Sequence, residues 1–396
     1  MKKITVIGDL MCEPPVFEQG KTEKGFDFSH VFRNLKPLLA EADYCIANLE
    51  TPLAGEEARY TYRLVSFNAP DEYAEAVRDM GIGLVSTANN HAMDRGNAGL
   101  KRTLEALDRV GLAHAGTSFG GASSIGYFEL DGVKIAVVAY TYGTNYGING
   151  EAPLENEGYH VNYLKPCTYA GGIRRPQPEN YRKALKELKE AQGGEASWED
   201  EVALRKKMGI SNAYWDDVLI PEDCEEGLAA VRADLAEARK NADLVFFLPH
   251  AGGQFNETPG AFSSYILYES AKMGFDGIFA AHSHTLQKAC YLKGTPCFYS
   301  MGNVTMDPYT DWAVPSSKPE YAVAAHLYLD GKKLAKTTFS ITKIVYEDGK
   351  LTVYPVDALL GKLNAADAEQ LKAETAGIFL RVTGREFPGI LHEYEL

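Results

Sequence analysis

The stretch GLVSTANNH (residues 83–91) decides the fold, because an apolar run stops abruptly at side chains able to hold a metal ion. Short runs rich in Val, Ile and Phe are typical of buried strands. The same layout recurs in ITVIGD (4–9), ADYCIANLE (42–50), ADLVFFLPH (242–250) and FDGIFAAHSH (275–284). We therefore predict five strands that each end in candidate ligands.

Segments with helical periodicity precede or follow most of these strands in the sequence. The predicted helices span 29–41, 71–80, 97–110, 222–241 and 261–273. Ser29 is the expected N-cap of the first helix, and Gly111 is expected to end the third. Strands that alternate with helices predict an α/β fold with a largely parallel sheet. The alternating segments 288–301 and 321–357 are expected to form a second sheet packed on the first.

The strand ends of a parallel sheet meet at one edge, where ligands bind. The polar residues at these ends are therefore predicted to converge: Asp9, Asn48, Glu50, Asn90, His91, His250, His282 and His284. His282 and His284 need a turn, because residues i and i+2 of a regular strand point to opposite faces. Just past a strand end, both can reach the same cluster.

Six of these residues form a mixed oxygen and nitrogen ligand set, which suits Mn, Fe or Zn. They are Asp9, Glu50, Asn90, His250, His282 and His284. Six ligands overfill one catalytic site but suit two divalent ions that share a bridging carboxylate. Such ions, about 3.5–4 Å apart, clamp the attacking and leaving oxygens of a displacement at phosphorus.

The remaining candidates surround this metal set. His91 adjoins Asn90 and is assigned as the general acid that protonates the leaving oxygen, with Asp94 orienting its ring. Arg95 and Arg63 are candidates for holding an anionic substrate, because a guanidinium fork fits phosphate or carboxylate. Asn48 and Asn303 are further candidates for contacting the substrate or supporting the site.

The composition argues against some classes of binding partner. The net charge of −14, from 40 basic and 54 acidic residues, opposes binding to nucleic acid or anionic membranes. No run of 18 apolar residues and no signal peptide is seen, so the chain as given is expected to be cytoplasmic, or extracellular-facing if a native leader precedes it. Six scattered cysteines without a C-x-x-C pair indicate reduced thiols.

Residues 1–396 are expected to form a single domain. Its regular pattern is interrupted at about 143–221, which predicts an inserted, mostly irregular segment with an amphipathic helix at 179–192. Strands and a final helix are predicted in 318–396.

Together these segments resemble the bacterial capsule-synthesis, CapA-like (poly-γ-glutamate biosynthesis) family of the calcineurin-like metallophosphoesterase superfamily. The motifs that carry the resemblance are GDLM, ADYCIANLETPLA, FNAP, STANNHAMDRG, AHAG, LPHAG, AHSHTLQ and YSMGNV. The resemblance implies a four-layer αββα sandwich with two metal ions at the strand ends. It places Asp9 and His284 on one ion, Asn90, His250 and His282 on the other, and Glu50 between them. Met11 departs from the superfamily pattern, since a histidine ligand is expected there.

The resulting expectation is a metal-dependent hydrolase that acts on a phosphoester or related anionic substrate in capsule or cell-envelope polymer metabolism. One alternative is a non-enzymatic accessory protein that binds an anionic polymer through a degenerate metal site, alongside envelope-polymer biosynthesis machinery. A third class is metal-assisted hydrolysis of an amide, since the same pair of ions can polarise a carbonyl.

Overall fold

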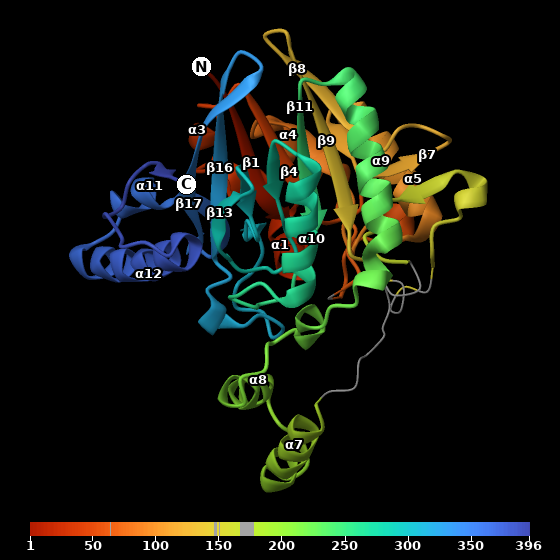
Figure 1. Ribbon diagram of the computed structural model, residues 1–396. Helices are drawn as coiled ribbons and strands as arrows, with labels where there is room; N and C mark the ends of the chain where they lie inside the picture. The colour runs from red at the N-terminus through yellow and green to blue at the C-terminus, as the bar shows by residue number, and fades with distance from the viewer. Residues whose placement is uncertain (64, 146–148, 150, 167–177) are drawn as a thin grey trace.

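Two β-sheets pack face to face, and helices cover the outer face of each (Figure 1). The structure, a computed structural model, describes residues 1–63, 65–145, 149, 151–166 and 178–396. Of the predicted insertion at about 143–221, residues 146–148, 150 and 167–177 lie outside the described residues. The four-layer αββα sandwich that the resemblance implies is confirmed.

The first sheet has the order β18-β17-β16-β1-β4-β5-β6, with β15 beside β1 and β19 beside β17. Parallel strands form one half of this sheet: β1 (Lys2–Leu10), β4 (Tyr44–Leu49), β5 (Ile82–Ser86), β6 (Ala113–Ala115) and the short β15 (Asn303–Thr305). Antiparallel strands form the other half: β16 (Tyr321–Asp330), β17 (Lys333–Glu347), β18 (Lys350–Pro355) and β19 (Tyr394–Glu395).

The second sheet has the order β13-β14-β12-β11-β9-β8. Its strands are β8 (Gly126–Leu130), β9 (Val133–Thr141), β11 (Leu244–His250), β12 (Gly277–Phe279), β13 (Ala289–Leu292) and β14 (Thr295–Phe298). Two small ribbons lie apart from both sheets: β2 (Lys21–Thr22) with β3 (Gly25–Phe26), and β7 (Thr117–Phe119) with β10 (Tyr159–Val161).

The predicted division of strands between the sheets is wrong. Strands β16 to β18 extend the first sheet, because β16 pairs antiparallel with β1. Strands β13 and β14 instead join β12 in the second sheet. Alternating apolar residues predict a strand with one buried face, but they carry no information on its long-range pairing partner.

Most predicted helices are confirmed. The first sheet is covered by α1 (Pro14–Gly20), α2 (Ser29–Phe32), α3 (Lys36–Leu39), α4 (Asp71–Asp79) and α5 (Gly96–Val110), and the second by α9 (Glu225–Asn241) and α10 (Ala261–Met273). Gly111 ends α5 in the left-handed conformation (φ 77°), as predicted. Between the sheets, Ile4, Val6 and Ile46 pack with Val137 and Phe246 in one apolar layer.

The predicted helix over 29–41 is divided into α2 and α3. Pro37 lies in the first turn of α3, where a residue without an N–H is tolerated but cannot extend a preceding helix. Ser29 is the first helical residue and not the N-cap. Instead, the side chain of Asp27 accepts a hydrogen bond from the Ser29 amide at 2.8 Å.

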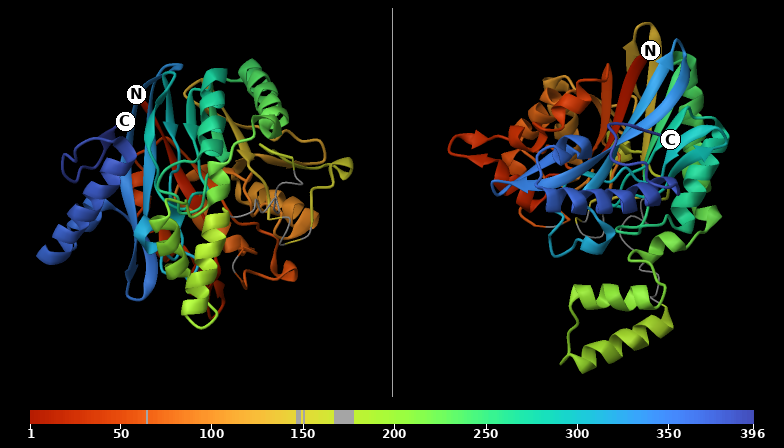
Figure 2. Two further views of the ribbon diagram at one scale, coloured as in Figure 1. Left: turned by 60° about the horizontal axis from the view of Figure 1, so that its bottom comes forward. Right: turned by 90° about the vertical axis from the view of Figure 1, so that its left-hand side faces the viewer.

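Four further helices of the described residues lie outside the central layers. Helices α7 (Glu179–Ala191) and α8 (Trp198–Lys207) project away from the two sheets (Figures 1 and 2). Near the chain end, α11 (Val356–Leu360) leads into α12 (Ala365–Thr383), which packs on β17 through Phe379 and Phe339. No helix in the described ranges is long and apolar enough to cross a membrane.

Glu374 fastens α12 to the first sheet. Its carboxylate accepts hydrogen bonds from Lys343 (2.6 Å), Lys318 (3.0 Å) and the hydroxyl of Tyr321 (2.8 Å). Burial raises the pKa of Glu374, but these partners outweigh it and lower the pKa from 4.5 to about 2. The ionised carboxylate therefore stabilises the fold.

We expect Glu374→Gln to lower the free energy of unfolding by about 1–2 kcal/mol at pH 7. A lowered pKa adds stability above pH 4.5 that is lost as the pH falls towards 2, so the difference should shrink over that range. Urea unfolding at several pH values measures it. The control Glu369→Gln removes an exposed ion pair with Lys372 and should change stability by less than about 0.5 kcal/mol. A Glu374 effect that is independent of pH would contradict this account.

Candidate metal centre

Strands of both sheets end at one rim of the sandwich. The ends of β1, β4 and β5 from the first sheet meet the ends of β11 and β12 from the second. Six candidate ligands are buried there: Asp9, Glu50, Asn90, His250, His282 and His284. The structure thus brings together all six residues of the predicted metal set, from segments far apart in the sequence.

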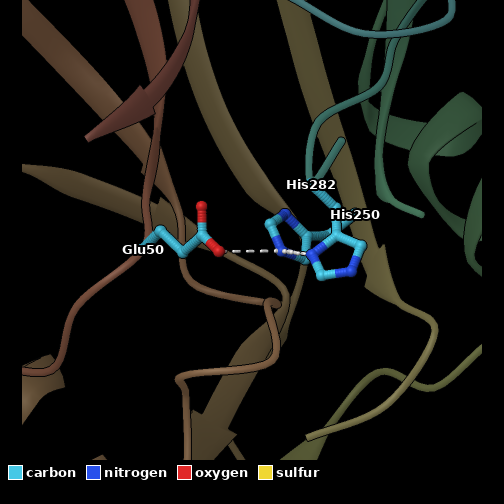
Figure 3. A group of neighbouring side chains, drawn as sticks. All are labelled: Glu50, His250 and His282. Carbon is cyan, nitrogen blue, oxygen red and sulfur yellow. Dashed lines mark hydrogen bonds and ion pairs between the residues drawn. The ribbon is translucent and has the colours of Figure 1, made fainter. Parts of the chain in front are cut away.

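Glu50 lies at the centre of this cluster. Its Oε1 is 3.3 Å from Nε2 of His250 and 3.7 Å from Nε2 of His284. Figure 3 shows the Glu50 carboxylate pointing across the rim at the imidazoles of His250 and His282. Two groups with ligand atoms within 4.8 Å of one another share Glu50: Glu50 with His250 and His282, and Asp9 with Glu50 and His284.

The Glu50 carboxylate is fully buried, yet neither of its oxygens accepts a hydrogen bond within the described part of the chain. Leaving a charged group in this state is costly unless a positive charge is close. Nε2 of His250 also lies 2.8 Å from Oδ1 of Asn90 and 3.1 Å from Nδ1 of His282. One proton on this nitrogen can serve only one of its neighbours. Several lone pairs that converge on a point fit a bound cation.

A sharp turn carries both histidines of the HSH sequence into the cluster. His282 has φ 101° and His284 has φ 52°, both in the region that non-glycine residues rarely adopt. Regular strand geometry would direct these side chains to opposite faces. Nδ1 of His284 lies 2.9 Å from Oδ1 of Asn303. This contact fixes the imidazole with Nε2 towards Glu50.

Two glycines allow Asp9 to enter the cluster. A side chain on Gly8 would bring a carbon within 2.0 Å of the Gly302 carbonyl oxygen, so only glycine fits where β1 meets the 300–303 turn. The Asp9 amide donates to that carbonyl at 3.0 Å. The Asp9 carboxylate accepts hydrogen bonds from the Asn48 side chain (2.7 Å) and the His282 amide (3.2 Å).

Burial controls the charges of the ligands. Desolvation raises the pKa of Asp9 to about 7 and that of Glu50 to about 8. It lowers the pKa of His250 to about 4 and that of His284 to about 3, and lowers that of His282 well below its ordinary value. The histidines are therefore neutral, as metal ligands must be, and supply no positive charge to Asp9 and Glu50. A bound cation would favour the ionised form of both acids. The donor set fits divalent cations.

His91 lies beside the cluster, outside both ligand groups. Its Nδ1 is 2.6 Å from Oδ2 of Asp94, and its ring stacks on Phe67 with centroids 4.0 Å apart. Burial lowers the pKa of His91, but Asp94, Glu50 and other carboxylates outweigh it and raise the pKa above its ordinary value. Asn89 holds the turn: it accepts from the His91 amide at 3.1 Å. This arrangement keeps a proton available at the rim.

The four residues predicted to contact the substrate do not share one environment. Asn48 and Asn303 are buried and bonded to ligands, so they position the cluster instead of facing a substrate. Arg95 directs its guanidinium at Ser66 (2.7 Å to Oγ) and at the Arg59 carbonyl (3.1 Å). Only Arg63 is exposed. Arg95 therefore holds a loop instead of facing a substrate, because a backbone and a side-chain acceptor lie close to it in the fold, which the sequence does not reveal.

Met11 is fully buried at the position where the resemblance implies a histidine ligand. Its backbone is held by Thr305, since the Met11 amide donates to the Thr305 hydroxyl at 2.8 Å. The thioether therefore fills the core in place of an imidazole. The ligand group around Asp9 consists of Asp9, Glu50 and His284.

Aromatic residues that the sequence analysis missed line the cluster. Tyr142 lies 4.6 Å from the His282 ring, and Trp215 lies 5.0 Å from Tyr142, measured between centroids. Trp312 packs 5.4 Å from His284. Trp215 belongs to the predicted insertion, whose end is anchored to α10 by the buried carboxylate of Asp216. No local pattern marks such residues, because their contacts are long-range.

Comparison with known proteins assigns the chain to a family. The model of the bacterial capsule synthesis protein PGA_cap family matches residues 3–308, and the chain belongs to that family. The match covers all six candidate ligands as well as His91 and Asp94. The resemblance noted in the sequence is thereby confirmed.

Two curated relatives are similar over most of this chain. The capsule biosynthesis protein CapA of Bacillus anthracis is 26% identical over 309 residues, which are 77% of this chain and 59% of the relative. The PGA biosynthesis protein CapA of Bacillus subtilis is 24% identical over 308 residues, 76% of this chain and 62% of the relative. The chain thus spans about 60% of the length of these relatives.

Among solved structures, a putative 5′-nucleotidase from Staphylococcus aureus in complex with alpha-ketoglutarate aligns with a TM-score of 0.43 and 13% identity. The alignment covers 93% of this chain and 57% of that one. Similarity at this level does not define an activity.

Proposed function

We propose that this chain is a metal-dependent hydrolase acting on a phosphoester or related anionic substrate in the metabolism of a cell-envelope polymer. The observation that carries the proposal is the Glu50 carboxylate, buried without a hydrogen-bond donor among the described residues and shared by two ligand groups. A carboxylate in this position fits a bridge between two cations.

Each residue has a defined role in this proposal. Asp9 and His284 would hold one divalent ion, whereas Asn90, His250 and His282 would hold the other, with Glu50 between them. Mn, Fe or Zn suits this mixed set of ligands. When bound, such ions polarise a phosphoryl oxygen and make water more acidic.

His91 supplies the proton in the proposed reaction. Asp94 holds Nδ1 at 2.6 Å, which leaves Nε2 of His91 as the nitrogen that can donate to a leaving oxygen. The Phe67 ring excludes water from one face of the imidazole. The raised pKa favours the protonated form that a general acid requires. Family membership supports the link to capsule or envelope polymers.

The test is phosphate release from 4-nitrophenyl phosphate by the full chain, first stripped of metal with a chelator and then supplied with Mn²⁺, Fe²⁺ or Zn²⁺. We expect turnover with at least one ion and none after stripping. Absence of turnover in a sample that holds metal would contradict the hydrolase.

One observation favours a second candidate function. Met11 leaves the Asp9 group with three residues, which lowers the expected affinity for that ion. A chain that holds only one ion could serve as an accessory protein that binds an anionic polymer without hydrolysing it. Binding of a polyanion such as poly-γ-glutamate, without turnover under any metal, would support this function.

A further inference from the structure

Three arginine side chains gather on one exposed tyrosine near His91. The guanidinium carbon of Arg59 lies 3.6 Å from the centroid of the Tyr62 ring, and those of Arg63 and Arg95 lie 5.5 Å and 5.7 Å from it. The Tyr62 side chain is 44% exposed, and Arg59 and Arg63 are exposed as well. We call this group the arginine patch.

The arginine patch has no ion-pair partner among the described residues. Across the residues that the structure describes, none of its three guanidinium groups forms an ion pair, although the chain has 54 acidic residues. Burial lowers the pKa of Arg95; the nearby Asp94 raises it, whereas the charges of Arg63 and Arg59 lower it. Like charges held together without a counter-ion repel one another, and a bound anion would relieve that repulsion.

The patch is held in place from below. Arg95 donates from Nε to the Arg59 carbonyl at 3.1 Å and from Nη1 to the Ser66 hydroxyl at 2.7 Å. The Asn68 side chain donates to the same Arg59 carbonyl at 3.1 Å. Arg95 is therefore a positioning residue, whereas Arg59 and Arg63 keep their guanidinium groups available.

Most of the arginine patch lies on a loop that contacts His91 and Asp94. Ser66 is followed by Phe67, whose ring stacks on His91 and whose amide donates to Asp94 at 2.6 Å. The loop that carries the patch thus adjoins the proposed general acid. In the proposed reaction His91 gives its proton to the leaving oxygen, so the departing part of the substrate is expected near the His91 side of the centre.

We propose that Arg59 and Arg63, arranged around Tyr62, bind an anionic group on the leaving portion of the substrate. The substrate then carries two separated negative groups: the one that reacts at the metal centre, and a carboxylate or phosphate held by the patch. A guanidinium fork accepts either group through paired hydrogen bonds. The inference rests on the proposed function, because it takes the direction of the leaving group from His91.

The test uses aryl phosphates with a para chain of several lengths that ends in a carboxylate, a phosphonate or a neutral carboxamide. For one chain length, kcat/KM should be at least fivefold higher with an anionic end than with the carboxamide. Arg59→Gln with Arg63→Gln should bring this ratio to about one, while Arg59→Lys with Arg63→Lys should keep part of it. The carboxylate and phosphonate ends show which anion the patch prefers.

Arg232→Gln is the matched control, since Arg232 is an exposed residue of α9 on the second sheet. It should leave the ratio unchanged. Added salt should lower the ratio in the wild type, because exposed charges are screened. A ratio near one for all chain lengths in the wild type, or an unchanged ratio in the double glutamine variant, would overturn the inference.

Binding distinguishes failure of this inference from failure of the proposed function. Analogues with a non-hydrolysable phosphonate in place of the phosphoester can be titrated by calorimetry whether or not the protein turns over. The same fivefold preference for the anionic end is expected in the dissociation constants. Tighter binding of the anionic end without phosphate release would support the role of the arginine patch and contradict the proposed hydrolase. Phosphate release without tighter binding of the anionic end would support the hydrolase and contradict the role of the patch.

Discussion

Glu50→Ala combined with His250→Ala is expected to abolish divalent-metal binding. Both ligand groups include Glu50, and one includes His250, so the pair removes two of the three ligands of one group and one of the other. Protein expressed with Mn, Fe and Zn should contain at least one ion per chain, whereas the double variant should contain none. Metal analysis by mass spectrometry after gel filtration measures this directly.

Thermal stability gives a second readout of the same loss. An ion at 100 times its dissociation constant should stabilise the wild type by about 2.7 kcal/mol, and it should not stabilise the variant. In metal-free buffer the variant is not expected to be much less stable than the wild type, because it no longer buries an acid whose ionisation is opposed by burial and whose oxygens lack hydrogen-bond partners among the described residues. Glu50→Gln with His250→Asn repeats the test with side chains of similar size.

The chain supplies a matched control for this prediction. Glu41, His392 and Glu393 form a third group of ligand-type side chains, but Glu41 and His392 are exposed. Lys3 already supplies a positive charge to this group, at 2.6 Å from Glu393 and 3.2 Å from Glu41. Glu41→Ala with His392→Ala should therefore retain full metal content. Full metal content in the Glu50 and His250 variant would contradict the assignment.

His91→Asn is expected to lower turnover by about 10²- to 10⁴-fold while the metal content stays unchanged. The reason is chemical: His91 lies outside both ligand groups and is oriented by Asp94. Loss of a general acid matters most when the leaving group is a poor one. The loss in kcat should therefore be larger for phenyl phosphate than for 4-nitrophenyl phosphate, whose leaving group needs little protonation.

His114→Asn is the control for this prediction, because His114 is a partly buried histidine on β6 paired with Asp108. Its activity should match the wild type on both substrates. An equal loss for the two leaving groups would assign His91 a structural role, and a loss of metal would make it a ligand. Either result would contradict the proposed role.

The sequence predicted those parts of the fold that depend on local pattern. The strand predicted at 242–250 is β11 (Leu244–His250), and the helix predicted at 261–273 is α10, because side-chain periodicity and capping are local properties. The sheet to which β16 belongs was not predicted, since its pairing with β1 joins residues more than 300 positions apart. Register with a distant strand leaves no trace in a single sequence.

For the candidate site too, the sequence predicts some features and only the folded chain shows the others. Ligand types at strand ends identified Glu50 and His250 as members of one cluster, because strand direction determines which ends meet. The environment of each side chain was less predictable. Asn303 serves the cluster by holding His284, and Arg95 supports a loop, since only the folded chain shows the backbone and side-chain acceptors around them. Trp215 has no sequence signal at all.

The most direct test of the central claim is a crystal structure of the full chain grown with Mn, Fe and Zn, with anomalous diffraction recorded at the absorption edge of each element. The account predicts an anomalous peak among Glu50, His250, His282 and Asn90, and a second, weaker one beside Asp9 and His284. Well-ordered ligand side chains at neutral pH with no anomalous peak between them would contradict it.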